Sequence, residues 1–112
     1  MFFSKKDTSS HELYKSAKKV EDDIWRLPIH DGYKDQLKSS IADLVNCSSS
    51  GYGGAITAAL FLNEFVDKDC DWIHFDIMAY NMRSRAGRPK GGEAMGLRSV
   101  CDYLEARYGK SN

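Results

Sequence analysis

Residues 53–66 carry apolar side chains at almost every position, which is typical of a helix buried around most of its circumference. The segment opens with Gly53 and Gly54 and continues Ala-Ile-Thr-Ala-Ala-Leu-Phe-Leu. Residues 72–78 then predict a strand that is apolar on both faces, as central and parallel strands are. These two elements indicate a large α/β domain, because a chain of 112 residues is short for burying either of them completely.

The N-terminal third alternates polar and apolar residues at helical spacing. Ser9 and Glu12 form a capping-box pattern, which marks the start of a helix. This helix should end before Pro28, because the residue before a proline avoids helical backbone angles, and we expect residues 25–29 to be extended. Its apolar stripe consists of Leu13, Ala17, Val20 and Ile24.

The remaining segments complete the predicted order α-α-β-α-β-α. We expect a short helix over residues 31–39, a short strand over 41–46, and loops over 47–54 and 81–92. A closing helix should span residues 93–108. Its predicted inner stripe consists of Ala94, Leu97, Val100, Cys101 and Leu104. This order indicates an α/β architecture with a right-handed crossover. Because two strands make a poor sheet, further strands are expected to come from outside this chain.

Composition argues against several classes of partner. The 16 basic and 16 acidic residues cancel, so the net charge favours neither nucleic acid nor an anionic membrane. The longest apolar run is far shorter than the roughly 20 residues that span a bilayer, and the N-terminus has no secretory pattern. We therefore expect a cytoplasmic protein without a membrane partner.

The three cysteines predict no disulfide framework. Cys47, Cys70 and Cys101 are odd in number and widely spaced. This usage is typical of a reducing compartment, and we expect the three thiols to be buried and structural.

His74 and Asp76 are the best candidates for a pair of metal ligands, because residues two apart on a strand share a face. A zinc or manganese site requires three or four protein ligands, and no third candidate accompanies them. We therefore favour a structural histidine that is hydrogen-bonded to a neighbouring carboxylate or carbonyl group.

One local cluster of basic residues precedes the closing helix, within residues 83–90. With Gly91 and Gly92 and a helix N-terminus behind it, the cluster could hold a carboxylate or phosphate. A solvated loop or a subunit contact is the favoured alternative. Nucleic acid is disfavoured because no aromatic residues are interleaved with the charges.

Several motifs resemble the C-terminal end of the M17 cytosol aminopeptidase (leucyl aminopeptidase) family, in the family's order and spacing. The matching residues are Trp25-Arg26-Leu27-Pro28, Tyr33, Leu37, Ser39, Ala42-Asp43, Asn46, Gly53-Gly54-Ala55-Ile56-Thr57-Ala58, Phe61-Leu62, Phe65, Trp72, His74 and Asp76-Ile77. The resemblance implies a mixed sheet flanked by helices, within a dinuclear enzyme that removes N-terminal residues from peptides. It also implies two zinc or manganese ions that activate a bridging water, and a homo-oligomer, normally a hexamer.

This chain departs from the family in its chemistry. The family's metal ligands, one lysine, three aspartates and one glutamate, belong to motifs that have no match here, so we assign no catalytic residue and no metal ligand. The family continues Ala-Gly after the last matched strand and uses nearby residues to wall the substrate pocket. By this resemblance, Met78 and Asn81 are the candidate substrate-binding residues, and the polar Asn81 leaves a preference for leucine open.

The sequence therefore predicts that residues 1–112 form the C-terminal part of a metallo-aminopeptidase catalytic domain. In this hypothesis the chain packs the sheet, contributes one wall of the substrate pocket and is inactive alone, with the metal-binding segments upstream. The alternative is a non-catalytic interaction module that self-associates or complements an N-terminal partner chain. DNA binding is the weaker alternative, because the net charge is zero.

Overall fold

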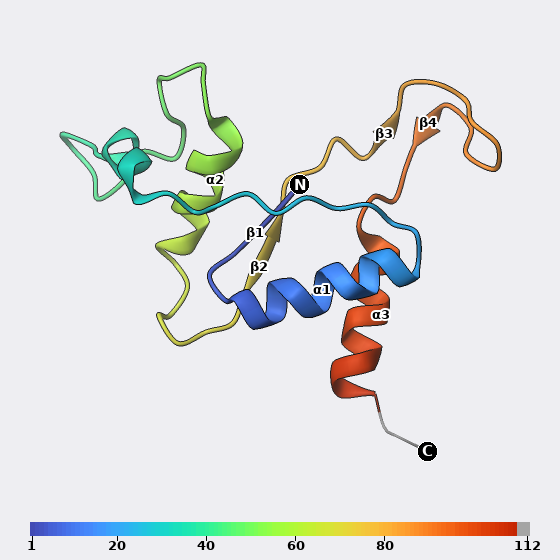
Figure 1. The fold of residues 1–112 in the computed structure, drawn as a ribbon. Coiled ribbons are helices and arrows are strands. Elements are labelled where there is room, and N and C mark those ends of the chain that lie inside the picture. The colour runs from blue at the N-terminus through green and yellow to red at the C-terminus, as the bar shows by residue number, and fades with distance from the viewer. Residues whose placement is uncertain (110–112) are drawn as a thin grey trace.

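The computed structural model describes residues 1–109, which form three α-helices, one 3-10 helix and four short strands (Figure 1). Their order is β1 (Phe2–Ser4), α1 (Asp7–Lys19), η1 (Asp31–Leu37), α2 (Gly54–Asn63), β2 (Ile73–Phe75), β3 (Tyr80–Asn81), β4 (Gly91–Gly92) and α3 (Leu97–Tyr108). Mixed helices and strands confirm the predicted fold class. No helix within residues 1–109 is long and apolar enough to cross a membrane.

Strand β1 is the central segment of the main sheet. It pairs antiparallel with β2, in the register Phe2↔Phe75, Phe3↔His74 and Ser4↔Ile73. On its other side it meets residues 25–27, through a 2.7 Å hydrogen bond from the Phe2 N–H to the Trp25 carbonyl and a parallel bridge to Arg26. The prediction that β2 is a parallel strand is therefore wrong for its pairing with β1. Strand β1 has three residues, which is too few to show a periodic pattern.

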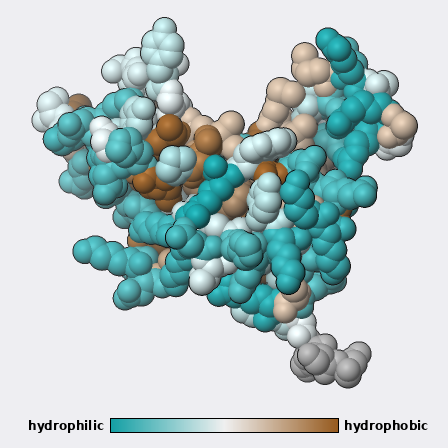
Figure 2. All heavy atoms as spheres, in the orientation of Figure 1, coloured by the Kyte–Doolittle hydropathy of each residue, from teal (hydrophilic) through white to brown (hydrophobic). Residues whose placement is uncertain are grey.

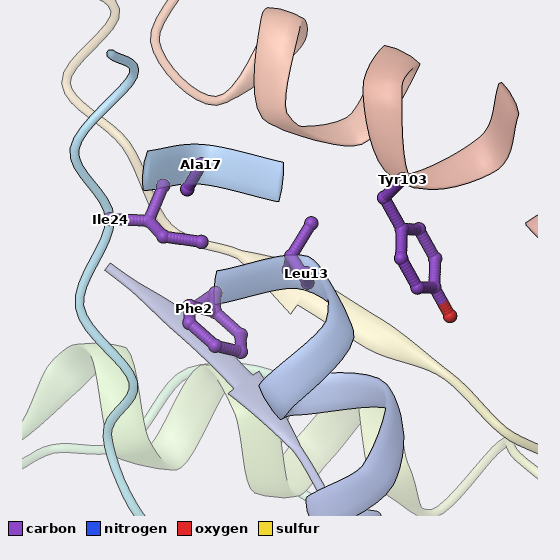
Figure 3. Close-up of a cluster of buried hydrophobic side chains, with 5 residues drawn as sticks. All are labelled: Phe2, Leu13, Ala17, Ile24 and Tyr103. Carbon is purple, nitrogen blue, oxygen red and sulfur yellow. The ribbon is translucent and has the colours of Figure 1, made fainter. Parts of the chain in front are cut away.

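The hydrophobic core lies on the face of the β1–β2 sheet that α1 and α3 cover. Figure 3 shows its buried members, Phe2, Leu13, Ala17, Ile24 and Tyr103. Three of these residues belong to the predicted apolar stripe of the first helix, which confirms that interpretation. Helix α2 lies beside the strands on the side away from α3 (Figure 1).

Two predicted elements differ for local reasons. Helix α1 ends at Lys19, short of Ile24, the last residue of its predicted stripe, because Glu21 adopts a left-handed conformation (φ 52°) and the Asp22 N–H bonds back to the Ala17 carbonyl at 3.0 Å. The predicted strand over residues 41–46 does not form. There the Ser39 hydroxyl oxygen accepts hydrogen bonds from two following backbone N–H groups and replaces the strand with a turn.

Helix α2 exposes more apolar surface than its sequence predicts. Thr57, Ala59 and Leu60 are buried, but Leu62 and, just beyond the helix, Phe65 are exposed. Figure 2 shows apolar side chains gathered at the surface over α2. Within this chain the helix is thus covered on one side only, and it ends at Asn63, short of the predicted 66.

Helix α3 presents a different face to the core from the one predicted. Ser99 and Tyr103 are buried and Val100 is half-buried, whereas the other members of the predicted stripe, Ala94, Leu97, Cys101 and Leu104, are exposed. The cause is a contact distant in sequence: the Ser99 side is drawn to α1 by the carboxylate of Asp22. All three cysteines are exposed, which also corrects the expectation of buried thiols.

Candidate functional site

A cleft of about 420 Å³ lies where the chain leaves β2 for the hairpin of β3 and β4. Residues 21–25, which follow α1, form one wall, and residues 75–78 form the second. The hairpin side chains Arg85 and Arg88 and the start of α3 complete it. Segments from three distant parts of the sequence therefore meet at the end of β2.

The structure places the two predicted substrate-binding residues differently. Met78 is 63% exposed and lines the cleft. Asn81 is 6% exposed and is not among the lining residues. Its amide nitrogen donates to the carbonyls of Arg88 (3.2 Å) and Pro89 (3.1 Å), and its amide oxygen accepts from Arg85 at 3.3 Å. Asn81 thus holds the hairpin closed, while Met78 faces the open space.

Ala79, between these two residues, has a left-handed backbone conformation with φ 51°. This conformation is strained for any residue with a Cβ atom. It turns the chain out of β2, and the Ala79 carbonyl then accepts a 3.0 Å hydrogen bond from the Glu93 N–H. The resemblance places a glycine here, which was the only available signal for this turn.

The N-terminus of α3 is bound by a carboxylate from the same chain. The buried Asp22 carboxylate accepts hydrogen bonds from the backbone N–H groups of Gly96 (3.2 Å) and Ser99 (3.1 Å). Burial alone would raise the pKa of Asp22, but these hydrogen bonds, aided by Arg98, hold the pKa below its ordinary 3.8. A carboxylate held ionised in this way serves as a helix cap.

This arrangement argues against an anion site at the basic cluster, which was the less favoured of the two interpretations. Gly91 and Gly92 form β4 and do not begin a helix, and the α3 N-terminus is already occupied by Asp22. Arg88 pairs with Glu93, which leaves the basic cluster partly neutralised. The hairpin is therefore a self-contained structural unit rather than a ready anion cradle.

The described residues do not fit a metal ion. The Nε2 atom of His74 is buried without a hydrogen-bond partner, and its ring stacks on Phe3 with centroids 6.0 Å apart. The predicted hydrogen bond from His74 to a carboxylate or carbonyl group at this atom is therefore wrong. Within residues 1–109 no three His, Cys, Asp or Glu side chains come together.

The sequence profile of the cytosol aminopeptidase family, catalytic domain, matches residues 1–101. A probable cytosol aminopeptidase of Syntrophotalea carbinolica is 39% identical over 105 residues, which is 92% of this chain and 21% of that protein. This chain thus spans about a fifth of the length of the curated relatives it matches.

Solved structures agree with the sequence match. The crystal structure of the cytosol aminopeptidase from Coxiella burnetii is 48% identical, with a TM-score of 0.90 over 96% of this chain and 23% of that one. The bottromycin maturation enzyme BotP in complex with Mn is 33% identical, with a TM-score of 0.88; the match covers 95% of this chain and 24% of BotP. Since the profile covers nearly the whole chain and the fold superposes on solved members, this chain belongs to the cytosol aminopeptidase family and corresponds to a segment of its catalytic domain.

Proposed function

We propose that this chain serves as the C-terminal part of a catalytic domain that removes N-terminal amino acids from peptides. The observation that carries the proposal is the cleft at the end of β2, lined by Met78 in a chain that matches the catalytic-domain profile. Met78 contributes one wall of the substrate pocket. Asn81 acts indirectly, by holding the hairpin that flanks that wall.

The proposed division of labour leaves the metal chemistry to other segments of the enzyme. Two zinc or manganese ions would supply the activated water, held by side chains outside residues 1–109. The Mn complex of BotP, which is similar to 95% of this chain, supports a metal-dependent reaction for the whole enzyme. In this proposal the described residues contribute packing, a pocket wall and the Asp22 cap of α3.

The test is a chimera. The matching segment of the C. burnetii enzyme is replaced by this chain, and hydrolysis of aminoacyl-p-nitroanilides is measured beside the unmodified parent. We expect kcat/KM within about tenfold of the parent, because pocket contacts of this kind discriminate by modest factors. A soluble, folded chimera that binds metal and does not turn over substrate would overturn the proposal.

The second candidate is a non-catalytic interaction module. The observation that favours it is the amount of exposed apolar surface, which includes Leu62, Phe65 and Leu104. Sedimentation of the purified chain distinguishes the two: a stable symmetric oligomer, with no activity in the chimera, would favour the module. On the basis of the family resemblance, we propose that the whole enzyme is a cytoplasmic homo-oligomer. We propose no nucleic-acid partner for it.

A further inference from the structure

Three of the four methionines of the chain line the cleft at the end of β2. They are Met1, Met78 and Met95, which belong to the N-terminus, the segment after β2 and the segment before α3. The apolar side chains that line the same cleft are Ile24, Trp25, Phe75 and Ile77. The fourth methionine, Met82, does not line the cleft. Thioether groups therefore form part of the apolar lining of the cleft.

Met78 is the most accessible of the three cleft methionines. It is 63% exposed, against 45% for Met1, and Met95 is half-buried. Exposure makes a sulfur atom susceptible to oxidants. If the cleft admits the side chain of a substrate, as the proposed function holds, it also admits a small hydroperoxide.

Oxidation of Met78 would make this wall of the cleft polar. A hydroperoxide transfers its terminal oxygen atom to the thioether: the O–O bond breaks, an S–O bond forms and the peroxide leaves as water or an alcohol. The sulfur is oxidised by two electrons and becomes a polar, chiral sulfoxide. The sulfoxide oxygen requires a hydrogen-bond donor once a substrate side chain displaces water from it, and an apolar side chain supplies none. The oxidised cleft should therefore bind apolar side chains more weakly.

We propose that Met78 is a site of reversible oxidation, at which a hydroperoxide weakens the binding of substrates with an apolar N-terminal residue. The inference rests on the proposed function, since it takes Met78 as a wall of the substrate pocket. Methionine sulfoxide reductases reverse the step. In that reaction a dithiol is oxidised to a disulfide, the S–O bond breaks and the oxygen leaves as water.

The exposed thiols of the chain also react with peroxide. Their disulfides and sulfenic acids are reduced by a dithiol alone, whereas a methionine sulfoxide requires the reductase. The need for the enzyme therefore separates an effect of Met78 from an effect of the cysteines.

The experiment treats the C. burnetii chimera with hydrogen peroxide and then with dithiothreitol, with or without the two stereospecific methionine sulfoxide reductases. Peptide mass spectrometry measures the oxidised fraction at each methionine, and KM is measured for leucyl-p-nitroanilide. Met78→Leu removes the sulfur at nearly constant side-chain volume. Met82→Leu is the matched control, because Met82 is 65% exposed and lies outside the cleft.

After dithiothreitol alone, we expect the KM of the natural chimera and of Met82→Leu to remain about tenfold above the untreated value. The reductases should return it to that value. In Met78→Leu, the treated KM should stay within about twofold of that variant's own untreated KM, because leucine has no sulfur to oxidise.

An equal rise of KM in Met78→Leu would assign the effect to another residue, and recovery with dithiothreitol alone would assign it to cysteines. Either result would overturn the inference, as would an unmodified Met78 in a protein whose Met82 is oxidised.

Binding of L-leucinol, which has the leucine side chain but no bond to hydrolyse, separates this inference from the proposed function. An inactive chimera that binds leucinol about tenfold more weakly once Met78 is oxidised contradicts only the proposed function. An active chimera whose KM is unaffected by oxidation of Met78 contradicts only the inference. A chimera that neither turns over substrate nor binds leucinol contradicts both.

Discussion

The Asp22 carboxylate accepts a 3.1 Å hydrogen bond from the backbone N–H of Ser99, 77 residues along the chain. The Ser99 hydroxyl donates a second hydrogen bond, of 3.0 Å, to the Asp22 carbonyl. These two bonds join the segment just after α1 to the first turn of α3, and both residues are buried. The long-range cap therefore decides which side of α3 faces the core and fixes one wall of the cleft.

Removal of this cap should destabilise the chain. Asp22→Ala leaves two N–H groups of α3 without their acceptor, so we expect the free energy of unfolding to fall by about 2 kcal/mol. Urea unfolding followed by circular dichroism measures the change. Asp23→Ala is the matched control, because Asp23 is exposed and its nearest partner, Lys18, lies 3.9 Å away. The free energy of unfolding of this control should stay within about 0.5 kcal/mol of the natural chain's value. Equal effects of the two variants would contradict the capping role.

Acid should weaken the same contact. Hydrogen bonds hold the pKa of Asp22 below 3.8 in the folded chain despite its burial. A carboxyl group whose pKa is lower in the folded state adds stability at pH values above 3.8, and this contribution is lost as the pH falls through the folded pKa. We expect the free energy of unfolding to fall more steeply with acid in the natural chain than in Asp22→Asn. Urea midpoints measured across this pH range test it, and parallel curves would contradict it.

The left-handed backbone conformation of Ala79 predicts a substitution that raises the free energy of unfolding. A glycine adopts φ 51° without the Cβ penalty, so Ala79→Gly should raise the free energy of unfolding by about 0.5 kcal/mol after the entropy of the more flexible unfolded chain is subtracted. Ala58→Gly, in the middle of α2, should lower it by about 1 kcal/mol. Thermal unfolding of both variants decides the matter. A loss of stability in both would show that position 79 is not strained.

Methionine substitutions test the pocket wall. In the chimera, Met78→Ala should raise KM for leucyl-p-nitroanilide about three- to tenfold and KM for the alanyl substrate less, because a larger apolar side chain loses more contact. Met82 is a matched control: it is 65% exposed, against 63% for Met78, and it does not line the cleft. Met82→Ala should leave both KM values unchanged, and equal effects at the two positions would remove Met78 from the pocket.

The periodic parts of the sequence were predictable, and the short parts were not. Leu13 and Ala17 recur at helical spacing, and the core contains both of them. Strand β1 has only three residues, which is too few to show alternation, and its partners in β2, such as His74 opposite Phe3, lie far along the chain. Local periodicity contains no information about such a pairing.

The surface of α3 shows how an apolar pattern can mislead within one chain. Leu97 and Leu104 are apolar residues at helical spacing and so fit an inner stripe, but the cap at Ser99 turns a different side of the helix inward. The pattern alone does not say whether such residues pack within this chain or against another segment.

The candidate site was predictable only in part. Met78 was named from the family resemblance and lines the cleft, and its role in substrate binding stays a prediction. The strained turn at Ala79 and the cap by Asp22 were missed, because a left-handed alanine and an acceptor distant in sequence leave no local signal.

In our proposal this chain supplies packing and a pocket wall, and the metal ligands belong to other segments of the enzyme. The most direct test is hydrolysis of leucyl-p-nitroanilide by the purified 112-residue chain, with and without added manganese or zinc. We expect no turnover and no stoichiometric metal with the isolated chain under any condition, and turnover of the same substrate by the chimera. Metal-dependent turnover that survives repurification of the chain alone would contradict it.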